Sequence, residues 1–125
     1  MTNPFRDQEK FMKACDQSVD GSDREQYEMY LKLITEEYKE LQEAIITGDV
    51  QEQLDALLDI IVVTIGAIHS AGFNGEGGWK EVMSTNFAKI DKETGKVRKR
   101  EDGKVLKPTG WVAPDLKPFL TKESK

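Results

Sequence analysis

The chain has 125 residues, which is the length of a single domain and enough to bury a sizeable core. Hydrophobic residues make up 38% of it, charged residues 33%, and the net charge is −5, a balance that excludes a general nucleic-acid-binding protein. The charge is uneven, because residues 89–107 hold eight lysines and arginines against four acids, so we expect a local basic arm on an acidic body.

Cys15 is the only cysteine, so no disulfide can form within one chain, and the sequence favours a reducing compartment. We expect its thiol to be buried and structural, since nothing else in the sequence indicates a nucleophile. No signal peptide opens the sequence, and the apolar run Ile60–Ile68 is too short to span a bilayer. A cytoplasmic protein without membrane or nucleic-acid partners is therefore expected.

Three helices are expected in the first part of the chain. A short first helix is predicted from Pro4, since proline favours the first position of a helix. A second helix is predicted from the capping-box serine Ser22 to its stop at Gly48. Asp49 can cap a third helix, which continues to about Ala71. The short break between the second and third helices favours an antiparallel hairpin.

In the second half of the chain, a loop, a fourth helix and a small β-hairpin are expected. The glycines of residues 74–78 predict a flexible loop, and a fourth helix is predicted over Trp79–Ile90. Asn86 falls on the apolar face of this helix, where it is either a satisfied core amide or a group that holds a ligand. The turn at Asp102–Gly103 predicts a small β-hairpin over residues 96–106. Prolines keep the remainder extended, and four apolar side chains offer anchors to a surface: Trp111, Leu116, Phe119 and Leu120.

Five acids are predicted to converge between the second and third helices. Glu36, Glu37 and Glu40 precede the break, and Asp55 and Asp59 follow it. At about 1.5 Å of rise per residue, Glu37 and Asp59 both lie about 16 Å from the break. Glu40 and Asp55 lie about 11–12 Å from it. Carboxylates gathered at one level repel one another unless a cation lies among them, and hard oxygen ligands suit Mg²⁺ or Mn²⁺.

A glutamate-rich helix is usually a solvated face, but the surrounding pattern argues against this here. Glu37 falls inside an apolar stripe of the second helix, and Asp59 stands in the apolar run 57–63. An ionised side chain in such a place needs a partner of opposite charge or a metal ion. The pattern therefore predicts a functional metal site.

The acidic motifs resemble those of a known family, the MazG-like branch of the all-α nucleoside triphosphate pyrophosphohydrolases. The resemblance rests on Glu36-Glu37-x-x-Glu40 followed by residues 55–63, and it covers about residues 25–120. It implies an enzyme that uses Mg²⁺, or Mn²⁺, to cleave the α–β phosphoanhydride of a (deoxy)nucleoside triphosphate into the monophosphate and pyrophosphate.

The resemblance also implies five metal-binding acids: Glu36, Glu37, Glu40, Asp55 and Asp59. Of these, Glu36 and Glu37 are the expected catalytic residues, with Glu36 orienting the attacking water or binding a further ion. One position departs from the family pattern, since Ala56 stands where the second motif usually has a glutamate. Asp55 takes the partner role here, and Glu52 is a weaker substitute.

Substrate contacts are expected beyond the hairpin. Residues 84–90 are similar to the family's Asn-x-x-Lys segment, which makes Asn86 and Lys89 candidates for contacts to the base, sugar or phosphates. The basic stretch 100–107 is similar to the tail of small single-domain members. Other basic tail residues form a pool from which one or two could hold phosphates: Lys96, Arg98, Lys99, Arg100 and Lys104.

Three other interpretations stay open. Phosphoribosyl-ATP is the second candidate substrate, although the long basic tail argues against it. A di-iron carboxylate bundle also collects glutamates, but it needs Glu-x-x-His pairs, and His69 is the only histidine. A non-catalytic helical interaction module would explain the amphipathic helices and the need for a partner.

The expected fold is all-α, a four-helix-type bundle in which an antiparallel helical hairpin carries the metal site. One domain is expected over residues 1–125, with a helical core over about 4–90 and an extended basic tail over about 91–125. The third helix is apolar around most of its circumference. A single partner helix cannot cover so much apolar surface. A homodimer or a homotetramer is therefore expected.

Overall fold

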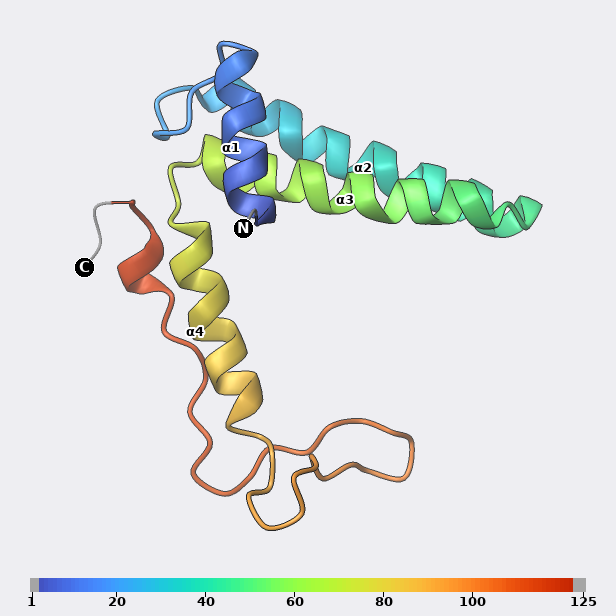
Figure 1. Cartoon of the computed structure of the whole chain (residues 1–125), viewed down its shortest axis with the longest axis vertical. Coiled ribbons are helices and arrows are strands. Elements are labelled where there is room, and N and C mark those ends of the chain that lie inside the picture. Colours follow the sequence, from blue (N-terminus) through green and yellow to red (C-terminus); the bar gives the residue numbers. More distant parts are fainter. Residues whose placement is uncertain (1–2, 123–125) are drawn as a thin grey trace.

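The computed structural model describes residues 3–122 and shows an all-α chain (Figure 1). Its helices are α1 (Pro4–Ala14), α2 (Arg24–Thr47), α3 (Val50–Ser70), α4 (Gly75–Phe87) and the short 3₁₀ helix η1 (Lys117–Phe119). Between residues 3 and 122 no strand forms. The predicted all-α fold and the close pairing of the second and third helices are therefore confirmed.

The hairpin of α2 and α3 turns as the sequence predicts. Gly48 ends α2 in the left-handed conformation, with a φ of 75°, which suits a residue without a β-carbon. Asp49 then caps α3 by accepting a hydrogen bond from the backbone N–H of Glu52 at 3.0 Å. The two helices lie side by side along their length, which fixes the register of the acids that they carry (Figure 1).

The start of α2 differs from the prediction by one residue. Asp23, not Ser22, is the capping residue, and its side chain accepts from the backbone N–H of Gln26 at 3.0 Å. The backbone N–H of Ser22 donates instead to Asp20 Oδ1 at 3.0 Å. Because Asp20 orders the turn ahead of the helix, the capping position moves one residue along the chain.

α1 crosses the end of the hairpin that is remote from its turn (Figure 1). Asn3 caps α1 through the backbone N–H of Arg6, and Pro4 is the first helical residue, as predicted. The core lies where these three helices meet and consists of Met12, Tyr30, Val63 and Ala67. Cys15 follows the last turn of α1 and is exposed, so the prediction of a buried thiol is wrong.

The glycine-rich segment that the sequence predicts as a flexible loop is the start of α4. Asn74 caps this helix by accepting from the backbone N–H of Gly77 at 2.9 Å. A side chain on Gly75 would collide with Phe5, and one on Gly77 would collide with Phe119. The glycines therefore allow close packing of α1 and the tail against α4, and they do not make the segment a loop.

The chain leaves α4 at Phe87, earlier than predicted, and forms a loosely paired loop. Single antiparallel bridges join Ile90 to Val97 and Lys99 to Val105. The predicted hairpin is therefore present as isolated pairing and not as strands. A paired ribbon of this size is marginal unless it packs on another element.

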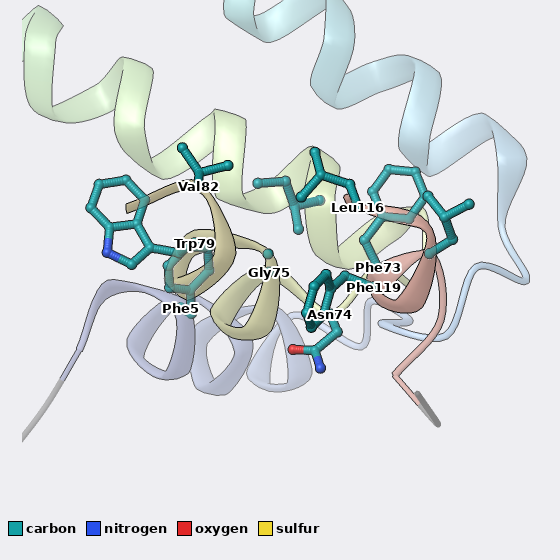
Figure 2. A pocket seen from close by; sticks show the side chains of 11 residues that line it. Phe5, Phe73, Asn74, Gly75, Trp79, Val82, Leu116 and Phe119 are labelled. Atoms are coloured by element: carbon teal, nitrogen blue, oxygen red, sulfur yellow. The ribbon is translucent and has the colours of Figure 1, made fainter. Parts of the chain in front are cut away.

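The end of the tail packs on the start of α4, with an apolar pocket of about 320 Å³ between them (Figure 2). Phe5 from α1, Trp79 from α4 and Phe119 from η1 line this pocket. The backbone N–H of Asn74 donates to the carbonyl oxygen of Phe119 at 2.9 Å, which ties the tail to the first turn of α4. The pocket anchors the tail and presents no cluster of charged groups.

α4 and the hairpin diverge, so that the C-terminal end of α4 lies away from the middle of the hairpin (Figure 1). By length and composition alone α3 could cross a membrane, and its apolar stretch extends beyond the run Ile60–Ile68. The core helix of a soluble protein passes the same test, and α3 packs on α2 and α1. We therefore describe α3 as the central helix of the fold.

Candidate active site

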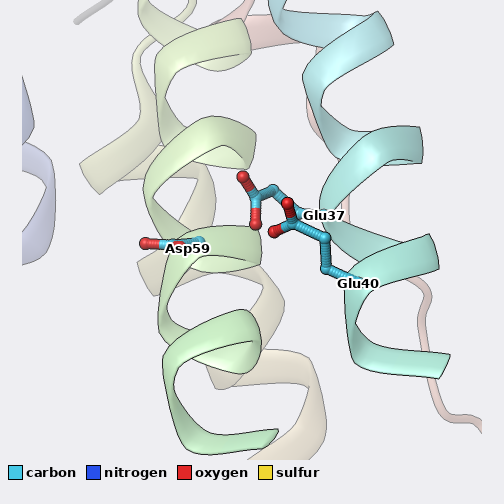
Figure 3. A group of neighbouring side chains, drawn as sticks. All are labelled: Glu37, Glu40 and Asp59. Atoms are coloured by element: carbon cyan, nitrogen blue, oxygen red, sulfur yellow. The ribbon is translucent and has the colours of Figure 1, made fainter. Parts of the chain in front are cut away.

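Three acids come together in the middle of the hairpin, two from α2 and one from α3 (Figure 3). Glu37, Glu40 and Asp59 each place one carboxylate oxygen within 4.8 Å of the others. Glu37 and Glu40 are three residues apart and so lie on one face of α2. Glu37 and Asp59 are half-buried, whereas Glu40 is exposed. Solvent and small solutes can therefore approach the cluster past Glu40.

Burial and mutual repulsion make these acids hard to ionise together. Burial, and then the adjacent carboxylate of Glu40, raise the pKa of Glu37 to about 7. The charges of Asp59 and Asp55 add to this rise. Burial, followed by the charges of Asp55 and Glu40, also raises the pKa of Asp59. Such shifts are what carboxylates show when they share a site without a compensating cation.

One oxygen of the cluster lacks a partner. Oε2 of Glu37 is buried and forms no hydrogen bond with any atom of residues 3–122. A buried carboxylate oxygen without a partner is costly, and a cation among the three carboxylates would remove that cost. Three convergent oxygen donors fit a hard divalent ion, so Glu37, Glu40 and Asp59 could hold a metal.

The two other predicted ligands lie outside this group. Glu36 and Asp55 are exposed, and neither joins the three clustered carboxylates. Asp55 is nevertheless close enough to raise the pKa of both Glu37 and Asp59. Its neighbour Ala56 is buried, with 3% of its surface exposed, so a methyl group occupies the position where the family motif has a glutamate.

The predicted substrate-binding pair lies at the end of α4. Lys89 Nζ donates to Asn86 Oδ1 at 3.1 Å, and both side chains are half-buried. Because the end of α4 points away from the hairpin, one chain does not bring this pair to the acids (Figure 1). The acids and this pair are therefore two separate groups within one chain.

The basic residues of the pool are spread over the loop that follows α4. Arg100 Nε donates to Asp102 Oδ1 at 3.0 Å, so its charge is paired locally. The others are exposed and form no ion pair with any acid among residues 3–122: Lys96, Arg98, Lys99 and Lys104.

Trp111, which was not predicted as a site residue, lies beside Lys89, and Lys107 approaches the same ring. Nζ of Lys89 is 5.0 Å from the ring centre of Trp111, and Nζ of Lys107 is 4.9 Å from the same centre. Trp111 was predicted only as an apolar anchor. No local pattern could reveal this grouping, because it depends on the path by which the tail returns to α4.

Comparison with known proteins gives a family match that covers most of the helical region. The model of the phosphoribosyl-ATP pyrophosphohydrolase family matches residues 6–86, which include the three clustered acids and extend to Asn86. No curated protein matched the chain. The family match indicates a hydrolase of the pyrophosphohydrolase type and confirms the resemblance that the acidic motifs carry. The chain belongs to the phosphoribosyl-ATP pyrophosphohydrolase family, within the MazG-like all-α nucleoside triphosphate pyrophosphohydrolase superfamily.

Proposed function

We propose that the protein is a metal-dependent enzyme that cleaves the α–β phosphoanhydride of a (deoxy)nucleoside triphosphate, releasing the monophosphate and pyrophosphate. The observation that carries this proposal is the cluster of Glu37, Glu40 and Asp59, in which a buried oxygen of Glu37 has no partner among residues 3–122. Family membership supports the type of reaction.

Mg²⁺ is the proposed cofactor, with Mn²⁺ as the alternative, because carboxylate oxygens are the ligands that these hard cations prefer. Glu37, Glu40 and Asp59 would hold it, with Glu36 and Asp55 as proposed further ligands. When bound, such an ion neutralises charge on phosphate oxygens and lowers the pKa of bound water. The raised pKa values of Glu37 and Asp59 support a cation here, because both groups would ionise more easily beside one.

Glu36 and Glu37 are the proposed catalytic residues. They are adjacent on α2, yet Glu36 is exposed and Glu37 is half-buried. Glu36 would orient the attacking water, since its carboxylate is accessible to solvent. Glu37 would hold its ligand oxygen on the inner side of the cluster, where the helix α3 limits its movement.

Asn86 and Lys89 are the proposed contacts to the base, sugar or phosphates, and Lys96, Arg98, Arg100 and Lys104 remain further candidates. The hydrogen bond between Asn86 and Lys89 orders both side chains and supports a joint role. Because these residues lie away from the acids of their own chain, we propose that a second copy brings its end of α4 to them.

A self-association surface is available on α3. Six of its large apolar side chains are exposed: Val50, Leu54, Leu57, Leu58, Ile61 and Val62. An apolar groove of about 690 Å³ continues this surface between α1, α3 and α4, and Ile61, Ile65 and Trp79 are part of its lining. Exposed apolar area of this kind on a helix usually marks an interface. We propose a homodimer or a homotetramer, in the cytoplasm, without membrane or nucleic-acid partners.

Phosphoribosyl-ATP is the second candidate substrate, and the description of the matching family favours it. The same acids would serve, because the bond that is cleaved is again an α–β phosphoanhydride.

The experiment is a hydrolysis screen of the purified chain with Mg²⁺ or Mn²⁺. The panel contains the common and modified nucleoside triphosphates together with phosphoribosyl-ATP, and the products are separated by anion-exchange chromatography. Monophosphate with pyrophosphate is the expected outcome. Release of orthophosphate with a diphosphate would contradict α–β cleavage, and no turnover with any substrate would contradict the enzyme assignment.

A further inference from the structure

The ring of Trp111 joins the tail to the last turn of α4. Its indole N–H donates to the carbonyl oxygen of Thr85 at 2.7 Å. The end of a helix leaves its last carbonyls without partners inside the helix, and the indole satisfies one of them. The backbone N–H of Trp111 donates to the carbonyl oxygen of Pro108 at 3.1 Å, and Gly110 takes a left-handed conformation with a φ of 81°. A tight turn therefore holds this half-buried ring in place.

Two lysines from different segments converge on the ring. Lys89 Nζ is 5.0 Å from its centre and Lys107 Nζ is 4.9 Å from it. The two nitrogens can be no farther apart than the sum of these distances, a separation that a di- or triphosphate chain can bridge. Lys89 uses one of its three N–H donors on Asn86, which leaves others for a ligand.

Neither ammonium group is paired with an acid in the part of the chain that the structure describes. The ion pairs among residues 3–122 involve other basic residues, namely Arg6, Lys13, Arg24, Arg100 and Lys122. Two like charges near one ring repel each other, and the negative face of the ring offsets only part of that repulsion. A polyanion in contact with both lysines would remove it, and lysine is a common phosphate ligand.

We propose that Lys107 binds the phosphate chain of the nucleotide together with Lys89, and that Trp111 is the residue that positions both lysines. This inference rests on the proposed function, in which Asn86 and Lys89 contact the substrate. The tail then has a defined role, because its Lys107 places one positive charge near the end of α4. Pyrophosphate, as product, would occupy the same lysines.

The test measures the binding of inorganic pyrophosphate to the full chain by isothermal titration calorimetry, without divalent metal so that the acids take no part. Lys107→Gln should weaken binding about tenfold, as expected for the loss of one charged hydrogen-bond donor. Lys107→Arg should restore most of the affinity. Lys92→Gln is the matched control, since Lys92 is an exposed tail lysine without a ring contact, and it should keep the affinity within about twofold of wild type.

Trp111 is tested with two variants. Trp111→Phe keeps an aromatic face but loses the donor to Thr85, so it should weaken pyrophosphate binding less than Trp111→Leu, which removes the face itself. Trp111 also anchors the tail, so a thermal melt accompanies each variant. The exposed Lys107 decides the question, because its replacement leaves the hydrogen bond between Trp111 and Thr85 in place.

Turnover separates this inference from the proposed function. With Mg²⁺ and the substrate found in the screen, Lys107→Gln should raise KM about tenfold and leave kcat within about threefold. Hydrolysis with unchanged KM and unchanged pyrophosphate binding would overturn the role of Lys107 while the enzyme assignment stands. Pyrophosphate binding that depends on Lys107, without any hydrolysis, would support the phosphate site and overturn the enzyme assignment. An equal loss of pyrophosphate affinity in Lys92→Gln would overturn the inference, since it would show that the total charge of the tail, and not Lys107 itself, determines binding.

Discussion

The ring of Tyr30 on α2 lies directly against Gly66 on α3, where the hairpin meets the core. A β-carbon on Gly66 would come within 3.0 Å of three atoms of this ring, which real contacts do not allow. The ring is not free to move, because Tyr30 is 5% exposed and its hydroxyl donates to Gln17 Oε1 at 2.6 Å. Gly66 therefore sets the separation of the two helices that carry the acids.

Gly66→Ala should lower the free energy of unfolding by about 1–3 kcal/mol, the usual cost of overpacking a core. Gly78→Ala is the matched control, since the nearest atom to its β-carbon would be 3.8 Å away, an ordinary contact. That control should be neutral or stabilising by up to about 1 kcal/mol, because alanine favours a helix. Urea denaturation measures both. Equal stability of the two variants would show that the ring of Tyr30 moves aside without lowering the free energy of unfolding.

The acid cluster should make the metal-free protein less stable as the pH rises. The folded chain raises the pKa of Glu37 from 4.5 to about 7, so it binds this proton more tightly than the unfolded chain does. The free energy of unfolding should therefore be highest below about pH 4.5 and fall up to about pH 7, by about 1.4 kcal/mol per unit of pKa difference before solvent screening reduces it. The raised pKa of Asp59 acts in the same direction.

Glu37→Gln should flatten this pH dependence, because the variant has no proton to lose at that position. Glu43→Gln removes an exposed charge from the same helix and should keep the wild-type slope. Thermal melts in EDTA across this pH range measure the slopes. If Glu37→Gln keeps the full slope, the crowding of acids around Glu37 does not govern stability.

Glu40→Gln should have opposite effects without and with metal. It removes one charge from a repelling cluster, so the metal-free variant should melt at or above the wild-type temperature. It also removes a proposed ligand, so Mg²⁺ should raise its free energy of unfolding only a little. For the wild type, Mg²⁺ at a hundredfold excess over Kd should raise the free energy of unfolding by about 2.7 kcal/mol. Activity should be lost. A lower metal-free melting temperature with retained activity would instead indicate a structural ion pair.

Ile61→Glu should shift the protein toward monomers, because it places a charge in the apolar groove that we propose as an interface. Val112→Glu is the matched control, since Val112 is an apolar side chain of the tail that is 76% exposed. Sedimentation equilibrium measures the assembly, and circular dichroism checks the helices. A wild type that is monomeric at every concentration tested would contradict the oligomer and the composite site.

The hairpin and the level of its acids could be predicted because both depend on local rules. The stop at Gly48, the cap at Asp49 and the regular rise of a helix bring Glu37 and Asp59 to one height. Which of the five acids lie closest together could not be predicted, because spacing gives the height of a residue but not the position of its carboxylate. Glu36 and Asp55 therefore lie outside the cluster although they occupy neighbouring positions.

The start of α4 and the grouping around Trp111 could not be predicted, because distant residues determine both. Glycines at 75 and 77 indicate a loop until Phe5 and Phe119 are known to pack against them. In the same way, nothing in the sequence near Lys89 reveals that Lys89 and Lys107 approach the same ring. Local patterns report the conformation of a segment, and tertiary packing overrides them where segments meet.

The hydrogen bond between Asn74 and Phe119 imposes an order on assembly during synthesis. α2 and α3 meet across a tight turn, so their hairpin can close while later residues are still being made. The tail can cover the first turn of α4 only after Phe119, which is synthesised after the whole intervening loop. Before the tail docks, the chain has its hairpin, but the apolar side of the first turn of α4 is uncovered. This interval is when the nascent protein is most exposed to chaperones and to premature contact with other copies.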